Sequence, residues 1–241
     1  MASARECVAT FTFIRHGQST NNGKPIWAGG GLDSPLSEHG LKEAELLGTW
    51  FSNSETKFDT IYVSKLKRAR QTANAIEHHT NTKPPLIEHA FLHEISFGEA
   101  DGKPYVAEET PGLSLEDHYK QGVYPHIRNR TDRFPGGESK EDVARRAEEV
   151  IQELIVPAIK DTANGHIAIV SHGVFLRELF YALHRRTNHK SSVEYKYLDT
   201  TGWTRMKIGF KIPADSQEAL EPSLSVLDVT HINVLDHLAG T

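Results

Sequence analysis

Cysteine is almost absent from this 241-residue chain, in which Cys7 is the single example. One thiol excludes an intramolecular disulfide and a zinc site built on cysteines, and we interpret Cys7 as a small core residue. Apolar runs are short: none approaches the roughly 18 residues of a membrane-spanning helix, and residues 1–7 lack a signal-peptide core. We therefore expect no membrane association and a cytoplasmic location, with the nucleus as the alternative.

Positive charge is also in short supply. Lys and Arg number 27 against 32 Asp and Glu, which gives a net charge of −5 with histidine neutral. Such a chain has no general attraction to nucleic acid, so we expect no nucleic-acid partner and expect a local group of cations to hold any bound anion. The composition is otherwise near the globular average, with 38% hydrophobic and 24% charged residues, and we expect one domain over residues 1–241.

A pattern of strand, polar loop and helix recurs three times. Apolar runs at 8–14, 59–63 and 166–170 predict buried strands, and each stops at a polar loop. Apolar residues at helical spacing predict four helices, over 37–51, 68–78, 141–159 and from 173 to about 183, and the tail has strand signals at 193–198, 203–212 and 224–229. The order predicts an α/β fold: a single-domain three-layer sandwich with a mostly parallel mixed sheet, helices on both faces and tail strands at the sheet edge.

Residues 103–133 interrupt this pattern. The segment contains three prolines and two glycines and is too long for a simple connector, which predicts an insertion lying over the site. Its cations either face inward, where they would meet a second phosphate on a substrate, or form a solvated loop offset by the acidic residues of the same segment. These cations are Lys103, Lys120, His126, Arg128, Arg130 and Arg133.

Three strand ends carry side chains that suit phosphate chemistry. Arg15 and His16 follow the first strand, Arg68 lies just beyond the second, and His172 follows the third. Because strand ends on one edge of a parallel sheet converge, we expect these side chains to form one cationic pocket. Arginine has planar donors that match phosphate oxygens, and neutral imidazole supplies a nitrogen nucleophile. Most of the 14 histidines are better interpreted as structural or solvated.

The loop Ile14-Arg-His-Gly-Gln-Ser-Thr-Asn-Asn22 resembles the Arg-His-Gly signature of the histidine phosphatase superfamily, which includes the cofactor-dependent phosphoglycerate mutases. Five further motifs follow in family order: 32–40, 64–72, 92–98 with Gly102, 134–139 and 170–173. The resemblance covers about residues 9–185. It implies that His16 is the nucleophile, that Glu94 is the proton donor, and that the remaining site residues bind the phosphoryl group or shape its loop. These are Arg15, Arg68, His172, Asn22, Gln18, Ser19, Gly17 and Gly173.

Each implied role answers a physical need. Two arginines and His172 can meet the charge of the transferring phosphoryl group, so we expect neither metal nor cofactor. Glu94 lies among apolar neighbours, which would hold its carboxyl protonated near neutrality until it donates to the leaving alkoxide. Glu99 and Asp101 are nearby rivals for this role.

Several positions have a structural interpretation that stays open. Asn22 and Ser19 are both typical turn residues, so either of them could shape the loop without touching the phosphoryl group. Glu138 and Ser139 are better explained as helix-capping residues than as catalysts.

The resemblance favours a phosphatase over a mutase. Family mutases carry an Arg-Phe-x-Gly-Trp stretch after the signature and paired arginines before a proline run, and both patterns are missing here. We therefore expect a metal-independent phosphomonoester hydrolase that forms a phosphohistidine and acts on small phosphate esters such as sugar phosphates, close to the fructose-2,6-bisphosphatase-like and broad-specificity branch. The alternatives are a phosphoglycerate mutase and a catalytically weak phosphate-binding or scaffold module. We expect a monomer or a homodimer.

Overall fold

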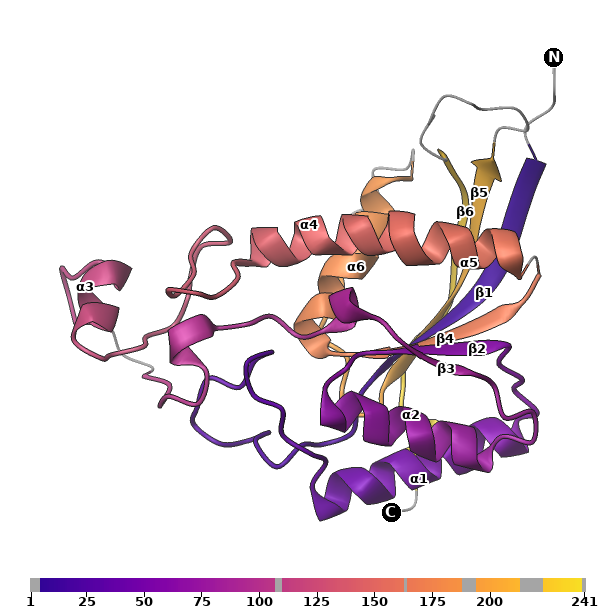
Figure 1. Ribbon diagram of the computed structural model, residues 1–241, viewed down its shortest axis with the longest axis horizontal. Coiled ribbons are helices and arrows are strands. Elements are labelled where there is room, and N and C mark those ends of the chain that lie inside the picture. The colour runs from indigo at the N-terminus through magenta and orange to yellow at the C-terminus, as the bar shows by residue number, and fades with distance from the viewer. Residues whose placement is uncertain (1–4, 107–109, 163, 188–193, 213–222, 240–241) are drawn as a thin grey trace.

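The computed structural model describes residues 5–106, 110–162, 164–187, 194–212 and 223–239. Their centre is a six-stranded sheet in the order β3-β2-β4-β1-β5-β6 (Figure 1). The strands are β1 (Arg5–Arg15), β2 (Thr60–Val63), β3 (Leu86–Glu88), β4 (His166–Ser171), β5 (Trp203–Ile212) and β6 (Ser223–Val234). The first four in spatial order are parallel, and β5 and β6 are added antiparallel beyond β1. This confirms the mostly parallel mixed sheet with tail strands at one edge.

Helices cover both faces of the sheet. One face is covered by α1 (Glu38–Asn53) and α2 (Lys67–His79), and the other by α4 (Lys140–Val150), α5 (Val156–Asp161) and α6 (Gly173–Arg185) (Figure 1). Ser37 caps α1 as predicted, its hydroxyl accepting the Gly40 N–H at 3.0 Å. Shorter helical turns are η1 (Ala90–Leu92), η2 (Gly98–Ala100) and η4 (Asp236–Leu238). The α/β sandwich predicted from the sequence is therefore confirmed.

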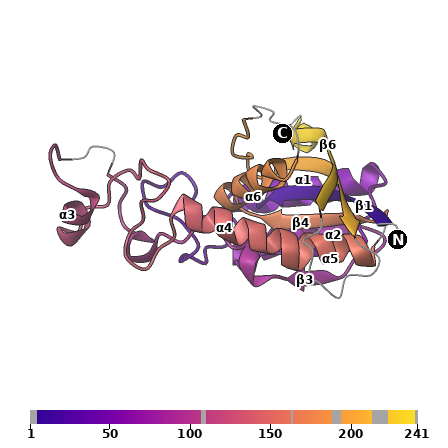
Figure 2. The ribbon, with the colours of Figure 1, turned by 90° about the horizontal axis from the view of Figure 1, so that it is seen from above.

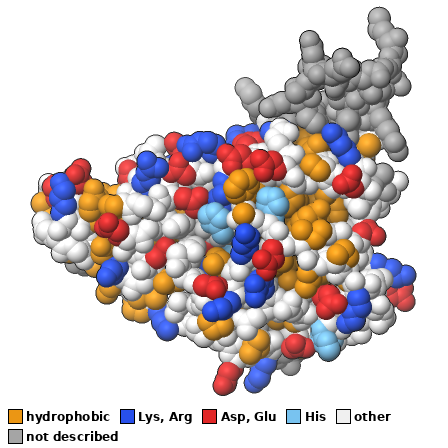
Figure 3. All heavy atoms as spheres, in the orientation of Figure 1, with side chains coloured by type: hydrophobic (Ala, Val, Ile, Leu, Met, Phe, Trp, Pro, Cys, Tyr) orange, Lys and Arg blue, Asp and Glu red, His pale blue; other side chains and the backbone are white. Residues whose placement is uncertain are grey.

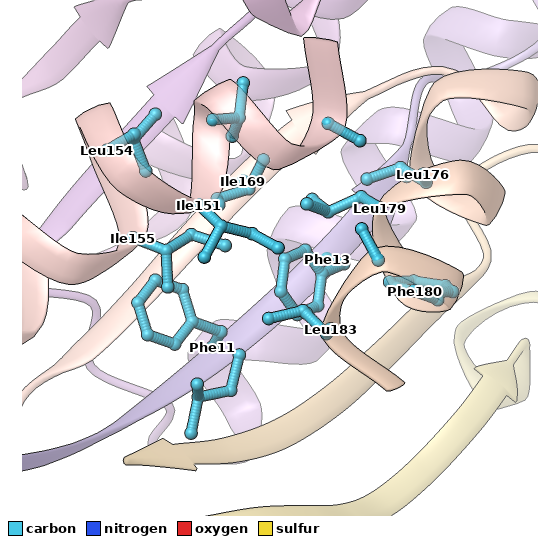
Figure 4. Packing of buried hydrophobic residues seen from close by; sticks show 14 of the residues in the cluster. Phe11, Phe13, Ile151, Leu154, Ile155, Ile169, Leu176, Leu179, Phe180 and Leu183 are labelled. Atoms are coloured by element: carbon cyan, nitrogen blue, oxygen red, sulfur yellow. The ribbon is translucent and has the colours of Figure 1, made fainter. Parts of the chain in front are cut away.

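Strand β1 lies in the middle of the core. Phe11 and Phe13 point to the face covered by α4 to α6, where Phe13 makes an edge contact with Phe180 at 5.2 Å between ring centroids (Figure 4). The next residue, Ile14, is buried on the opposite face with α1 and α2. Burial on both faces explains the continuous apolar run of β1. Because β1 is a central strand, its C-terminal end places Arg15 and His16 inside the molecule.

The helix predicted over 141–159 is present but not uniform. A π-helical segment, η3 (Ile151–Ile155), separates α4 from α5, and Pro157 follows directly. Proline has no N–H to donate into the preceding turn, so the widened turn accommodates a missing hydrogen bond that the apolar spacing alone does not reveal.

The strand predicted over 193–198 is wrong for residues 194–198, while Val193 lies outside the described residues. Their backbone groups bond to side chains instead: the Tyr195 carbonyl accepts from Arg177 Nε at 2.8 Å, and the Leu198 carbonyl accepts from Arg15 Nη1 at 2.6 Å. The buried positions Tyr195 and Leu198 are three apart, which does not fit the alternation of a strand. The short β3 was not predicted, because three residues give too little pattern.

Residues 103–106 and 110–133 form a lobe, and these described residues contain one short helix, α3 (Leu115–Lys120). In Figures 1 and 2 the lobe extends beyond the C-terminal end of β1, and α3 lies at its outer end. Its inner part is anchored by a small apolar cluster in which Tyr124 and Ile127 pack with Phe134 and Trp27. No helix in the described part of the chain is long and apolar enough to cross a membrane.

Candidate active site

The ends of three neighbouring parallel strands meet at one edge of the sheet. β1, β4 and β2 lie side by side, and they deliver His16, His172 and Ser64. The imidazole rings of His16 and His172 lie 5.0 Å apart between centroids, at 60° to each other. Arg68, in the first turn of α2, reaches the same point. The structure thus brings together the four residues that the sequence placed at strand ends.

His16 is buried and held in one tautomer. Its Nδ1 lies 2.7 Å from the Gly17 carbonyl oxygen, so Nδ1 carries the proton and Nε2 carries the lone pair. Burial lowers the pKa of His16 well below its ordinary value, and the charges of Arg68 and Arg15 lower it further. The ring is therefore neutral at physiological pH, with Nε2 turned toward the Arg68 guanidinium at 3.2 Å from its Nε.

Arg68 is fixed by the loop that follows the signature. Its Nη1 donates to the Leu32 carbonyl at 2.8 Å and its Nη2 to the Gly29 carbonyl at 3.3 Å, which leaves Nε directed at His16. Burial lowers the pKa of Arg68 and the Glu94 carboxylate opposes that shift, but a guanidinium remains charged. A positive charge therefore lies against the His16 Nε2 lone pair.

Among the residues that the structure describes, His172 and Arg15 each have a buried nitrogen without a hydrogen-bond partner. The His172 Nε2 lies 2.8 Å from the Ser64 hydroxyl, whereas its Nδ1 has no hydrogen-bond partner. The Arg15 Nη1 donates to Leu198, whereas its buried Nε is unpaired. Burial lowers the pKa of His172, with the neighbouring His16 adding to the effect. Buried unpaired polar groups are costly in a folded protein, and two of them converging beside one nucleophile are suited to an anionic ligand.

The Glu94 side chain docks on the N-terminus of α6. Its Oε2 accepts from the Val174 N–H and its Oε1 from the Phe175 N–H, both at 3.2 Å, and Oε1 also accepts from the Ile95 N–H at 3.0 Å. The N-terminal amides of a helix are natural partners for carboxyl oxygens, so they fix the Glu94 side chain in place. Gly173, the first residue of α6, lies against the Arg15 guanidinium.

The rival acids have structural roles. Glu99 is exposed. Asp101 accepts from the backbone N–H groups of Gly29, Gly31 and Phe97 at 2.8 to 3.0 Å, and burial raises its pKa. It therefore organises the glycine loop whose Gly29 carbonyl binds Arg68.

Glu138 is a support for the Glu94 loop rather than a helix cap. Both its oxygens pair with Arg146, each at 3.0 Å, and Arg146 also donates to the carbonyls of Phe91 and His93 at 2.8 Å. Ser139 does cap α4, in a reciprocal arrangement with Asp142. The capping interpretation is confirmed for Ser139 and is wrong for Glu138.

The small polar residues of the signature loop are occupied within the loop. Asn22 Oδ1 accepts from the Ser19 N–H at 2.7 Å, a turn that its residue type favours. Gln18 Oε1 accepts from the Ser37 hydroxyl at 2.7 Å, at the start of α1. Gly17 approaches α1 so closely that a Cβ there would lie 2.7 Å from the Gly40 carbonyl oxygen, so only glycine fits.

A second support was not predicted from the sequence. The Thr201 N–H donates to the His16 carbonyl at 3.3 Å, and the Thr201 hydroxyl lies 2.8 Å from Nε2 of buried His237. The Thr200 hydroxyl donates to Glu43 at 2.6 Å, and Glu43 accepts from the Gln18 N–H at 2.7 Å. The C-terminal segment therefore clamps the His16 loop, an arrangement that no local motif reveals because its members lie far apart in the chain.

Three of the insertion cations are engaged away from the pocket. Arg130 makes a bidentate pair with Glu178 at 3.1 and 2.6 Å, Arg133 pairs with Asp142 at 3.0 Å, and Lys120 pairs with Glu116 at 2.7 Å. These contacts argue against a second-phosphate site built on them. Acidic and basic side chains are interspersed over the face shown in Figure 3. Within the described ranges no cluster of three or more His, Cys, Asp or Glu side chains could hold a metal ion.

Comparison with known proteins agrees with this geometry. The chain matches the family model for the histidine phosphatase superfamily (branch 1) over residues 11–211. It is 34% identical to 2,3-bisphosphoglycerate-dependent phosphoglycerate mutase of Cytophaga hutchinsonii over 174 residues, 71% of this chain and 76% of that protein. It is 31% identical to fructose-2,6-bisphosphatase TIGAR of Xenopus tropicalis over 145 residues, 59% of this chain and about half (48%) of that protein.

Solved structures show the same fold. A mycobacterial glucosyl-3-phosphoglycerate phosphatase superposes with a TM-score of 0.63 at 22% identity, covering 85% of this chain and 91% of that chain. Phosphoglycerate mutase from Bacillus anthracis superposes with a TM-score of 0.65 at 23% identity, covering 84% and 88%. Fold and matches together define an α/β enzyme of the phosphatase and mutase class. The chain belongs to the histidine phosphatase superfamily, branch 1.

Proposed function

We propose that this enzyme hydrolyses phosphomonoesters of small metabolites, a class that includes sugar phosphates, through a phosphohistidine on His16. The observation that carries the proposal is the arrangement around the His16 Nε2 lone pair. The charged Arg68 lies 3.2 Å away, the His172 ring lies 5.0 Å from the His16 ring between centroids, and the Arg15 charge acts on His16. Among the described residues, the buried Arg15 Nε and His172 Nδ1 have no hydrogen-bond partner. A tetrahedral dianion would satisfy these nitrogens while placing its phosphorus against a neutral nucleophile.

In the first half-reaction the His16 Nε2 lone pair forms a bond to phosphorus as the ester P–O bond breaks. The electron pair of that bond goes to the leaving oxygen, which takes a proton from the Glu94 carboxyl group. Arg68, Arg15 and His172 meet the charge on the equatorial oxygens. The Gly17 carbonyl, 2.7 Å from Nδ1, stabilises the positive charge that develops on the ring.

In the second half-reaction a water molecule attacks phosphorus and the N–P bond breaks. Glu94, now a carboxylate, takes a proton from that water, and the electron pair returns to the His16 Nε2. Inorganic phosphate is released and both side chains regain their starting states. The phosphoryl charge is met by protein cations at every step, so the proposal needs neither metal nor cofactor.

A steady-state assay tests this function. Inorganic phosphate release should be measured across sugar phosphates, phosphoglycerates and p-nitrophenyl phosphate, for the enzyme and for His16→Ala, with and without EDTA. We expect turnover that survives the chelator and is lost in the variant. Loss of activity in EDTA with recovery on added magnesium would contradict metal independence, and absence of turnover on every ester would favour a phosphate-binding module.

A mutase is the second candidate, because the relative at 34% identity carries that name. A mutase must protect the phosphohistidine from water and return the phosphoryl group to a reoriented substrate. Interconversion of 2- and 3-phosphoglycerate, followed alongside phosphate release, separates the two activities. Interconversion faster than release would favour the mutase.

A further inference from the structure

A largely apolar pocket of about 140 Å³ is lined by Ile95, which follows Glu94 in the chain, and by Val174 at the start of α6. Six of its nine lining residues are hydrophobic: Trp27, Ile95, Phe97, Ile127, Val174 and Tyr197. Two of them carry the backbone N–H groups that bind the Glu94 carboxyl, Ile95 at 3.0 Å and Val174 at 3.2 Å. In the proposed function the Glu94 carboxyl must reach the leaving oxygen, so the pocket begins where the leaving group begins.

The walls of the pocket are built to stay apolar. The Trp27 ring packs against Phe97 at 4.5 Å and Phe134 at 5.4 Å between centroids. Its indole N–H donates to the Tyr124 carbonyl at 2.9 Å, so its one polar atom is already satisfied. Buried Ile127, from the insertion, closes the pocket on another side.

The polar groups at the rim are few and partly engaged. His126, Asp132 and Lys140 complete the lining. The His126 Nδ1 lies 3.4 Å from the Tyr105 hydroxyl, and Asp132 accepts from the backbone and side chain of Asn129 at 3.2 and 2.9 Å. A polyhydroxylated sugar would therefore turn most of its hydroxyls toward apolar walls, and the opposite charges of Asp132 and Lys140 give the lining no net attraction for a second phosphate.

We propose that this pocket is the leaving-group subsite, and that it selects phosphomonoesters whose alcohol carries an uncharged, apolar body of about the size of one aromatic ring. An apolar cavity of about 150 Å³ accepts benzene, which is close to the volume here. The inference rests on the proposed function, because it assigns to Glu94 the contact with the leaving oxygen. It narrows the substrate class away from sugar phosphates.

Two esters with chemically matched leaving groups test the subsite. 2-Phenylethyl phosphate and glucose 6-phosphate both release a primary alcohol, so their demand for proton donation is similar. We expect the wild-type enzyme to hydrolyse the phenylethyl ester with a kcat/KM at least about tenfold higher, because small apolar groups change kcat/KM by roughly 10- to 200-fold in such pockets. Tyr197→Ser and Ile127→Ser should remove most of this preference, chiefly by raising KM for the phenylethyl ester.

Ile87→Ser is the control, because Ile87 is 42% exposed on β3 and does not line the pocket. It should keep the wild-type preference. Tyr197 is 44% exposed, so its variant tests the proposal even where loss of the buried Ile127 perturbs folding. Equal kcat/KM for the two esters in the wild-type enzyme, or an unchanged ratio in Tyr197→Ser, would overturn the subsite and leave the phosphatase in place. Hydrolysis of neither ester, with turnover of p-nitrophenyl phosphate or a phosphoglycerate intact, would also overturn the subsite, whereas absence of turnover on every ester would overturn the proposed function itself.

Discussion

At the scale of single residues, the site depends on two imidazoles kept neutral by burial and on Arg68, whose Nε donates to the His16 Nε2 lone pair at 3.2 Å until a phosphoryl group takes that place. Burial and the charges of Arg68 and Arg15 depress the pKa of His16, and the Gly17 carbonyl fixes the proton on Nδ1. The nucleophile is therefore unprotonated across the physiological range without a carboxylate partner to orient it.

The acid role of Glu94 makes a prediction about leaving groups. Glu94→Gln keeps one acceptor oxygen for the Ile95 and Phe175 N–H groups, loses the acceptor that faces the Val174 N–H, and cannot donate a proton to an alkoxide as a carboxylic acid does. We expect kcat to fall by roughly 10²- to 10⁴-fold on alkyl phosphates and much less on p-nitrophenyl phosphate, whose leaving group needs little protonation. The comparison of the two losses is the measurement, with exposed Glu99→Gln as the control that should match wild type. Equal losses on both esters would mean that Glu94 positions the substrate or water without protonating it.

The sequence predicts a site residue where a single local motif carries both the reactive side chain and its place at a strand end. Arg15 ends β1 and His16 follows it directly, and His172 follows β4 in the same way. The docking of Glu94 on α6 could not be predicted, because it joins groups about 80 residues apart through backbone amides of any residue type. Glu138 was misinterpreted because its partner Arg146 is identified only by the packed structure.

At the scale of elements, periodicity located the helices and the long strands, and it failed where other contacts override it. Residues 194–198 have an apolar pattern, yet α6 side chains and Arg15 take their backbone groups. The widened turn of η3 depends on a single proline. The irregular backbone of the insertion is held by the apolar cluster of Tyr124, Ile127 and Phe134. These residues have no periodic spacing in the sequence, so their packing could not be predicted from it.

The element η4 gives the second prediction. His237 supports Thr201, which binds the His16 carbonyl, so His237→Ala should let the His16 loop shift. Because displacements of about 1 Å cost up to 10²-fold in rate, we expect kcat to fall at least about tenfold with KM little changed. His237→Gln, which retains an N–H donor, should restore part of the loss, and exposed His231→Ala should behave as wild type. A wild-type kcat in His237→Ala would exclude this positioning role.

At the scale of the whole molecule, buried neutral histidines link stability to pH. Burial lowers the pKa of both His166 and His237 to about 4, against about 6.5 in an unfolded chain. Between these values the unfolded state binds more protons than the folded state, so the free energy of unfolding rises with pH. The stability that these histidines contribute is lost as the pH falls from 6.5 to 4. Above pH 6.5 the histidines are neutral in both states and contribute no slope. His16 and His172 act in the same direction.

We therefore expect acid to destabilise the fold by up to roughly 3 kcal/mol for each of His166 and His237. Denaturant unfolding measured from pH 7.5 to 4.5 gives the slope. His166→Gln should reduce it by about one proton, whereas exposed His78→Gln should not. A slope that is the same in His166→Gln and in the wild-type protein would show that His166 does not titrate on unfolding as described.

The covalent intermediate on His16 is the central claim, and trapping it tests that claim most directly. The enzyme should be mixed with a phosphate ester, quenched in alkali within one turnover, digested and examined by mass spectrometry for the modified residue. We predict a base-stable, acid-labile phosphoryl group on His16, absent from His16→Ala, which should also lose turnover. A phosphoryl group found on another residue, or wild-type turnover by His16→Ala, would contradict the mechanism.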